Sequence, residues 1–151
     1  MRLRSQTTAA LAALLDLSLH GADHAPVSVA DIAKRQGVGT AFLEQLFRPL
    51  KKAGLVAPWR GMKGGYTLAK PADAIQLLAV MQALDDPAVR PYAVAKGKDS
   101  AERQALAQVI RSAEEALAGS LSQLNLAELK RQAQARPDLK SAPRRGAGFQ
   151  I

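Results

Sequence analysis

The sequence of 151 residues contains no cysteine and only two histidines, His20 and His24. The absence of cysteine excludes disulfides and every thiolate-bound metal or iron–sulfur centre, and two histidines supply a zinc site poorly. No stretch reaches roughly 18 uncharged apolar residues, as a membrane span requires, and no secretory signal is visible near the start of the chain. We therefore expect a cytoplasmic protein that binds neither a metal, nor a cofactor, nor a membrane.

The residues present also give little support to an enzyme. There is no cysteine nucleophile, and two histidines offer no Ser-His-Asp arrangement. No Gly-Lys-Ser loop is present to cradle a phosphate. We therefore expect no catalytic residues.

The sequence instead carries an excess of positive charge. Lysine and arginine number 21 against 13 aspartates and glutamates, which gives a formal net charge of +8. Such an excess attracts polyanions, and nucleic acid first among them. The segment 40–70 holds six basic residues and one acid, Glu44, and a second basic cluster lies in the tail, at Arg136, Lys140, Arg144 and Arg145.

The first third of the chain has the pattern of a helix-turn-helix. Apolar residues at helical spacing predict a first helix over residues 6–19. Ser28 is predicted to cap a short second helix that stops at Gly37, a residue suited to a left-handed C-terminus. A third helix follows at once, with Thr40 as its predicted cap and Gly54 at its end. Two short helices joined by so tight a turn are typical of a helix-turn-helix.

One residue of the third helix breaks a local rule. Pro49 lies well inside the helix, where the missing N–H and the ring clash cost about 3 kcal/mol. We expect a kink or an early end near Arg48.

Two short strands are predicted next, over residues 55–57 and 66–68. The loop between them is rich in glycine and basic residues, as expected of a hairpin: Trp59-Arg60-Gly61-Met62-Lys63-Gly64-Gly65. A basic hairpin after a helix-turn-helix makes a winged helix-turn-helix. We expect Trp59 and Tyr66 to pack this wing onto the helices, with stacking on nucleic acid as the alternative. Apolar residues over 75–84 predict a further helix.

The C-terminal part is predicted to hold one long helix. Residues 87–99 have little periodicity and indicate a linker. A helical pattern then runs from Ser100 to about Leu124, and Asn125 is predicted to cap a short final helix over 126–133. The long helix carries a narrow apolar stripe that suits packing along another helix, formed by Leu106, Ile110, Ala113, Leu117 and Leu121.

The predicted fold class is therefore mainly α. Residues 1–86 form a winged helix-turn-helix DNA-binding domain, and residues 87–99 form the linker. Residues 100–135 hold the long C-terminal dimerisation helix and the short final helix. Residues 136–151 are rich in proline, glycine and basic residues, and we expect this basic tail to be disordered.

Several motifs of the chain resemble one family of bacterial regulators. The resemblance is carried by Asp31-Ile32-Ala33, Phe42-Leu43-Glu44-Gln45-Leu46-Phe47, Leu50-Lys51-Lys52-Ala53-Gly54-Leu55-Val56 and Arg60-Gly61-Met62-Lys63-Gly64-Gly65-Tyr66-Thr67-Leu68. These segments are similar to the Rrf-two type of winged-helix transcription regulators. The similarity is strong over residues 1–86 and moderate over the long helix.

The resemblance implies a homodimer on a palindromic operator, in which the long helix of each subunit makes the dimer contact. Sensing members of the family bind a 2Fe–2S or 4Fe–4S cluster through three cysteines between the winged domain and the dimer helix. Residues 90–101 of this chain contain no cysteine and no histidine. The chain is then either a cluster-free member or an apo form whose cysteines were replaced by alanine, for example at Ala93, Ala95 and Ala101.

The candidate site residues fall into four groups. The start of the third helix is the part that reads base edges in the major groove, here Thr40, Ala41, Glu44 and Gln45. Gln45 can bond adenine bidentately, and Glu44 can accept from a cytosine amino group and so reject sites that lack one. The wing supplies Arg60 for a narrow minor groove, with Gly61, Lys63 and Gly64 beside it. The phosphate candidates are Arg2, Arg4, Lys51 and Lys52, and the dimer candidates are the five apolar residues of the stripe.

We therefore predict a sequence-specific DNA-binding transcriptional regulator. It is expected to act as a repressor, binding a palindromic operator as a homodimer in the bacterial nucleoid. Two alternatives remain open, namely the apo form of an iron–sulfur cluster sensor and a winged-helix module that binds proteins instead of DNA.

Overall fold

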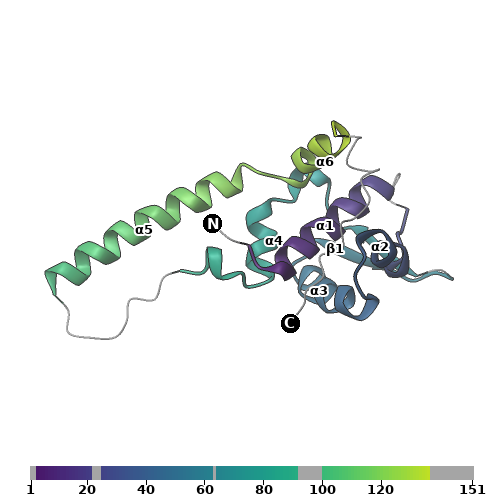
Figure 1. Cartoon of the computed structure of the whole chain (residues 1–151), viewed down its shortest axis with the longest axis horizontal. Helices are drawn as coiled ribbons and strands as arrows, with labels where there is room; N and C mark the ends of the chain where they lie inside the picture. Colours follow the sequence, from purple (N-terminus) through teal and green to yellow (C-terminus); the bar gives the residue numbers. More distant parts are fainter. Residues whose placement is uncertain (1–2, 22–24, 63, 92–99, 137–151) are drawn as a thin grey trace, which may run out of the picture.

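The computed structural model describes residues 3–21, 25–62, 64–91 and 100–136. Figure 1 shows a cluster of helices with a small hairpin at one end and one long helix projecting from the other. In chain order the elements are α1 (Ser5–His20), α2 (Val29–Gln36), α3 (Thr40–Lys52), β1 (Val56–Trp59), β2 (Gly65–Leu68), η2 (Ala72–Ala74), α4 (Leu77–Ala83), η3 (Pro87–Val89), α5 (Ala101–Ser122) and α6 (Leu126–Gln134). The mainly helical winged fold is confirmed.

The hydrophobic core is built around α1, which contacts α2, α3, α4 and α6. The face of α1 that points into the core is almost completely buried, and it is formed by Ala10, Ala13, Leu14 and Leu17. Burying such a stripe removes apolar area from water and drives the helices together. α1 is therefore the element on which the rest of the domain is assembled.

The helix-turn-helix of α2 and α3 forms as the sequence predicts, with one shift. Ser28 caps α2 by accepting from the Asp31 backbone N–H at 3.1 Å, and Gly37 ends it in the left-handed region at φ 65°. The cap of α3, however, is Gly39 and not Thr40. Gly39 is extended, and its carbonyl accepts the first helical bond from Leu43 at 3.1 Å, so Thr40 is already the first helical residue.

Helix α3 continues through Pro49 to Lys52, so the early end near Arg48 is wrong. The side chains of Phe47 and Leu50, on either side of the proline, are both fully buried. Full burial of such side chains is worth about 1.5–3 kcal/mol each, which together matches or exceeds the roughly 3 kcal/mol that an interior proline costs. Tertiary packing therefore decides where this helix ends.

The wing is an antiparallel hairpin of β1 and β2, with Val56 opposite Leu68 and Trp59 opposite Gly65. Val27 bridges to Tyr66 through two backbone hydrogen bonds of 3.0 Å and so joins the hairpin to the start of α2. The Tyr66 ring stacks on Phe47 of α3 with the centroids 4.4 Å apart. The predicted packing of Tyr66 onto the helices is confirmed.

The two C-terminal helices, α5 and α6, do not belong to one packing unit, although the sequence analysis grouped them in the segment 100–135. Backbone bonds of 2.9 Å from Leu77 to Leu124 and from Leu126 to Ile75 fasten the chain after α5 to the region before α4. Leu126 lies in the same buried cluster as α1 and α3, and α6 packs on α1. The final helix, expected to group with the dimerisation helix, therefore belongs by packing to the winged domain.

Helix α5 starts after Ser100, as the helical pattern predicts, and the Ser100 hydroxyl caps it by accepting from the Arg103 N–H at 3.3 Å. Its C-terminal half lies near α4 and η3, whereas its N-terminal half extends away from the other helices (Figure 1). The expected disorder of residues 137–151 and most of the predicted linker, residues 92–99, lie outside the described residues.

Candidate nucleic-acid interface

The N-terminal part of α3 presents one polar face to solvent. All four predicted base-reading residues are exposed, namely Thr40, Ala41, Glu44 and Gln45. On the opposite side of the helix Leu43, Leu46 and Phe47 are buried. The alternation at helical spacing fixes the rotation of α3, so that this polar face points away from the core.

Arg48 belongs to the same face, although it was not among the predicted site residues. It is exposed and lies three and four positions after Gln45 and Glu44, which is the spacing that places helical side chains side by side. That spacing, applied to the basic residues of the segment, would have found it. Arg48 therefore supplies a positive charge next to the acidic Glu44.

The tip of the wing is a tight turn. The Gly64 N–H donates to the Gly61 carbonyl at 3.0 Å, and Gly64 has a φ of +51°, which favours glycine. Arg60 and Gly61 are exposed, whereas Gly64 is half-buried; Lys63 lies outside the described residues. Trp59 is 53% exposed, and it lines a hollow together with Ser28 and Asp31 at the start of α2.

Gly65 at the base of the wing cannot carry a side chain. Its φ is +138°, and a Cβ there would lie 2.4 Å from the Val27 carbonyl oxygen. The close approach is what allows Val27 to pair with Tyr66. This glycine therefore sets the position of the wing relative to α2.

The remaining predicted cations lie at the ends of helices. Arg4 is the residue before α1, and Lys51 and Lys52 form the last turn of α3; all three are exposed. Arg2 lies outside the described residues. Cations in these positions can neutralise phosphates without reading sequence.

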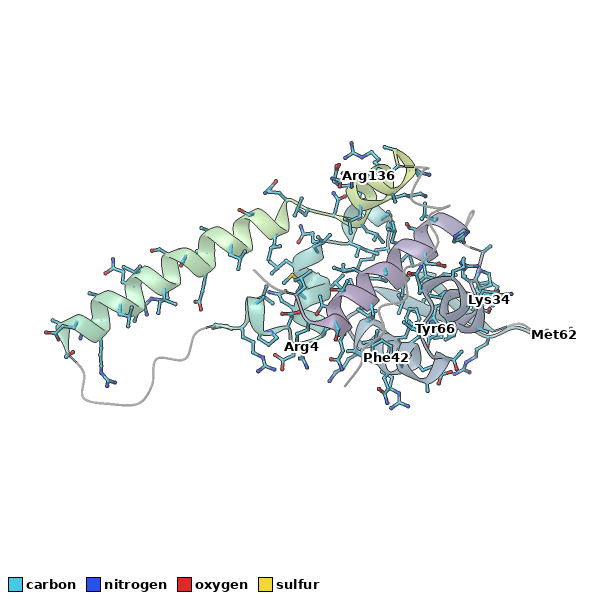
Figure 2. All side chains as sticks on the ribbon, in the orientation of Figure 1. Arg4, Lys34, Phe42, Met62, Tyr66 and Arg136 are labelled. Carbon is cyan, nitrogen blue, oxygen red and sulfur yellow. The ribbon has the colours of Figure 1, made fainter. Side chains whose placement is uncertain are left out.

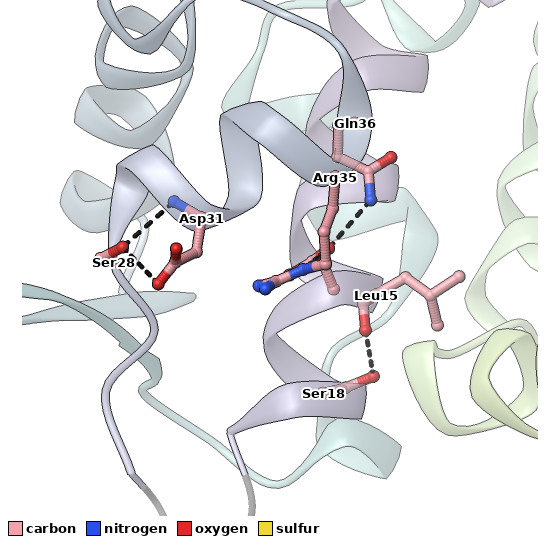
Figure 3. A network of polar contacts seen from close by, with 7 residues as sticks. Leu15, Ser18, Ser28, Asp31, Arg35 and Gln36 are labelled. Atoms are coloured by element: carbon pink, nitrogen blue, oxygen red, sulfur yellow. Dashed lines mark hydrogen bonds and ion pairs between the residues drawn. The ribbon is translucent and has the colours of Figure 1, made fainter.

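An ion pair between the buried Asp16 and the partly exposed Arg35 holds α2 against α1 (Figure 3). Arg35 donates from Nη2 to Oδ1 of Asp16 at 2.6 Å and from Nε to Oδ2 at 2.9 Å, and the Gln36 side-chain amide also donates to Oδ2, at 3.0 Å. The Asp16 side chain is only 2% exposed. Its hydrogen bonds to Arg35 raise the pKa of the guanidinium, against the opposing effect of burial. Because α2 orients α3, this pair contributes to the position of the reading face.

A second buried carboxylate, Asp86, holds the start of α1. It accepts from the Thr7 hydroxyl, from the Arg4 N–H at 3.2 Å and from the Ala88 N–H at 2.9 Å, and it has no exposed surface. Burial alone would raise the pKa of Asp86, but the bonds from Thr7, Ala88 and Arg4 outweigh it and hold the pKa below its ordinary value. The junction after α4 is thereby tied to the segment that carries Arg4.

The predicted dimer residues differ in exposure along α5. Leu106 and Ala113 are exposed, and Ile110 and Leu117 are half-buried. Val109, which the sequence stripe omitted, is 68% exposed. Leu121 is 5% exposed within the single chain, because this end of α5 reaches the winged domain. A cleft of about 210 Å³ separates this half of α5 from α4 and η3, with Leu78, Val89 and Leu117 among its lining residues.

The residues do not fit a thiolate-bound cluster. The sequence contains no cysteine, and the described residues hold no group of three or more histidine, aspartate or glutamate side chains that could bind a metal ion. Of the three alanines considered as replaced cysteines, Ala101 is the exposed first residue of α5. Ala93 and Ala95 lie outside the described residues.

The fold and the basic, exposed α3 and wing define a winged-helix DNA-binding protein. Among the described helices none is both long enough and apolar enough to cross a membrane. A family model described as "Rrf2: Iron-dependent Transcriptional regulator" matches residues 3–132. The chain therefore belongs to the Rrf2 family of transcriptional regulators, and it is a DNA-binding transcription regulator and not an enzyme.

Relatives and solved structures agree with this assignment. The HTH-type transcriptional regulator IscR of Erwinia tasmaniensis is 42% identical over 130 residues, covering 85% of this chain and 78% of the relative. T. potens IscR superposes with a TM-score of 0.67 at 30% identity, covering 91% of each chain. CymR, described as the global cysteine regulator of B. subtilis, superposes with a TM-score of 0.68 at 26% identity, covering 87% of this chain and 98% of that one.

Proposed function

We propose that this regulator binds a palindromic operator as a homodimer and represses transcription by occluding the promoter. The observation that carries the proposal is the division of the exposed side chains. The exposed face of α3 is polar and basic, and Arg60 is exposed on the wing, whereas α5 exposes the apolar side chains of Leu106 and Val109. One surface suits DNA and the other suits a second copy of the chain.

We propose that α3 lies in the major groove. Gln45 is suited to adenine, to which it can donate and from which it can accept. Glu44 is suited to the amino group of cytosine, and its charge repels phosphate unless such a donor is present. Thr40 and Ala41 lie one turn earlier on the same exposed face, within reach of neighbouring bases.

The wing and the helix ends are proposed to contact the strands on either side. Arg60 is exposed at the wing, where a guanidinium suits the enhanced negative potential of a narrow minor groove. Gly61 and Gly64 allow the backbone to approach closely. Lys51, Lys52 and Arg4, together with Arg2 and Lys63, are proposed to neutralise phosphates, which makes affinity fall steeply with salt.

The dimer is proposed to form along α5. Leu106 and Val109 are 55% and 68% exposed in the single chain, and a long helix with unburied apolar residues is stabilised by a partner helix. A two-fold symmetric dimer would present two reading helices to two half-sites, matching a palindrome.

We propose further that the protein works in the cytoplasm on nucleoid DNA and without an iron–sulfur cluster. The absence of cysteine removes the thiolates that such a cluster requires. The codons at positions 93, 95 and 101 of the natural gene test this, because cysteine codons there would restore the sensor alternative.

Duplex selection followed by binding measurements tests the DNA proposal. Duplexes selected by the wild-type protein from fragmented genomic DNA serve as the probe, with fluorescence anisotropy at fixed salt as the readout. Gln45→Ala and Arg60→Ala should each weaken binding by about 1–3 kcal/mol while sparing binding to unselected DNA. Gln123→Ala and Arg111→Ala, exposed residues at the end of α5 and within it, are matched controls and should have no such effect.

Two results would contradict the proposal. Unchanged affinity of either variant for the selected duplex would remove that residue from the reading surface. Failure of the wild-type protein to prefer any fragment would favour the protein-binding module instead.

A further inference from the structure

Large exposed apolar side chains occur at only two places among the described residues. Leu106 and Val109 lie on α5, where the proposed dimer would cover them, and Leu124 lies directly after that helix, next to the winged domain. The other two, Trp59 and Met62, lie on the wing. The roles proposed above for the wing depend on its positive charge and its glycines. They assign no function to the exposed side chains of Trp59 and Met62.

Met62 stands at the tip of the wing. It follows Gly61 in the turn that the Gly64-to-Gly61 hydrogen bond closes, and its side chain is fully exposed, at 107%. Figure 2 shows Met62 at the extremity of the molecule, at the end opposite to α5. The unbranched apolar side chain of Met62 therefore projects into solvent from the turn of the β1–β2 hairpin.

The Trp59 ring lies against the turn of this hairpin. A Cβ placed at Gly61 would lie 3.0 Å from the indole Nε1, so the ring lies against the turn and would have to shift slightly to admit a side chain there. Arg60, two positions before Met62 in the sequence, is an exposed cation of the same loop. The wing thus carries both an apolar side chain at its tip and a cation.

The geometry points to a wedge: we infer that Met62 inserts from the minor groove between two base pairs of the operator flank. The inference rests on the proposed function. The thioether is only a weak acceptor, so Met62 is poorly suited to reading base edges by hydrogen bonds. Apolar side chains, methionine among them, instead enter a base step and partly unstack it. Arg60 would bind in the minor groove while the Met62 side chain inserts between the base pairs.

A wedge reads deformability and not base identity. Pyrimidine–purine steps such as TA and CA unstack most easily. The operator should therefore carry such a step beneath each wing, outside the bases that α3 reads. Met62 would then be a specificity-determining residue that prefers sequences by their stiffness.

The test compares three proteins in duplex selection, namely the wild type, Met62→Ser and Met62→Leu. The wild type and Met62→Leu should select a pyrimidine–purine step in the flank, because leucine keeps an apolar wedge. Met62→Ser should lose this flank preference while keeping the preferences of the central bases. Replacing the step by a stiff AA step should weaken the wild type about 5- to 30-fold and Met62→Ser less than about 2-fold.

Bending of the duplex gives a second readout. Energy transfer between dyes at the two ends of the selected duplex should report a bend of roughly 20° or more with the wild type and with Met62→Leu. The bend should be smaller with Met62→Ser. Urea unfolding of the free proteins should be the same for all three, since the side chain makes no packing contact in the chain.

The outcomes separate the two proposals. If Met62→Ser retains the flank preference and the bend, the wedge is wrong and the DNA-binding proposal stands. If the wild-type protein selects no duplex at all, the proposed function fails and the wedge fails with it.

Discussion

At the scale of single residues, Asp86 shows how one buried carboxylate can organise a junction. Its three donors come from Arg4, Thr7 and Ala88, so the start of α1 and the segment after α4 share one acceptor. No local pattern predicts this contact, since Thr7 and Asp86 are 79 positions apart. A sequence shows where a carboxylate is, but the fold decides which donors reach it.

Asp86→Ala should destabilise the protein by about 2–4 kcal/mol, because three donors lose their acceptor in a site closed to water. Urea unfolding at pH 7 measures the change. Asp73→Ala is the matched control: it removes an exposed carboxylate and should change stability by less than about 0.5 kcal/mol. A loss no larger than that of the control would show that the Asp86 bonds contribute nothing net.

The same residue sets a pH dependence with a definite sign. Because its pKa is lower in the folded protein than its ordinary value of 3.8, the stabilisation is fully present above that value and is lost as the pH falls through the folded pKa. The stability difference between the wild type and Asp86→Asn should therefore shrink as the pH falls below about 3.8. A difference that stays constant from pH 6 to about pH 2 would contradict the ionised, hydrogen-bonded state.

At the scale of elements, α2 is held against α1 by an ion pair that no local sequence pattern predicts either. Asp16 and Arg35 are separated by 19 positions and come from different helices. Arg35→Ala leaves the buried Asp16 charge with Gln36 as its remaining side-chain donor. Since the Arg35 side chain is 35% exposed and partly screened, we expect a loss of about 2–3 kcal/mol, below the full value for a buried pair.

Urea unfolding measures this loss too, and Lys34→Ala provides the comparison. Lys34 is the exposed neighbour on the same helix, so its removal changes the charge equally without touching Asp16. Equal stability of the two variants would mean that the ion pair does not hold α2 in place.

Pro49 gives an element-level prediction of the opposite sign. Within α3 it has no N–H to donate to the Gln45 carbonyl, four positions earlier. Pro49→Ala restores that bond, while the freer unfolded chain offsets part of the gain. We expect a net stabilisation of about 1–2 kcal/mol by urea unfolding. A destabilised variant would show that the proline ring itself packs favourably.

The elements themselves were largely predictable because their signals are local. Ser28, Ser100 and Asn125 cap the helices that their neighbours predict, and Gly37 ends α2. The errors arose where packing overrode a local preference. Gly39 precedes Thr40 as the cap, and the burial of Phe47 and Leu50 carries α3 through its proline.

At the scale of the whole molecule, the exposed apolar side chains of Leu106 and Val109 on α5 predict the oligomeric state. Leu106→Glu places a charge in the proposed dimer contact and should convert the dimer to a monomer, as measured by sedimentation equilibrium. Gln108→Glu adds the same charge on the other side of the helix and should leave the dimer intact. A monomeric wild type, or a dimer that survives Leu106→Glu, would exclude this helix as the contact.

The sequence predicted the regions of the candidate interface better than its details. Binary patterning placed the exposed face of α3, and glycines marked the wing. Arg48 could have been added to that face from its spacing to Glu44 and Gln45, whereas the exposure of Trp59 depends on three-dimensional packing. The grouping of α6 with α1 likewise follows from long-range contacts, which no local pattern encodes.

Helix α5 contacts the winged domain only with its C-terminal half, so a small rotation at that end moves the opposite end by a large distance. The helix has 22 residues, which gives a length of about 33 Å. The cleft beside its C-terminal half leaves space between it and the winged domain. A tilt of about 10° at that end would move the far end by roughly 6 Å. In the proposed dimer, a minor repacking beside Leu117 could then change the separation of the two reading helices by more than one base-pair step of about 3.4 Å.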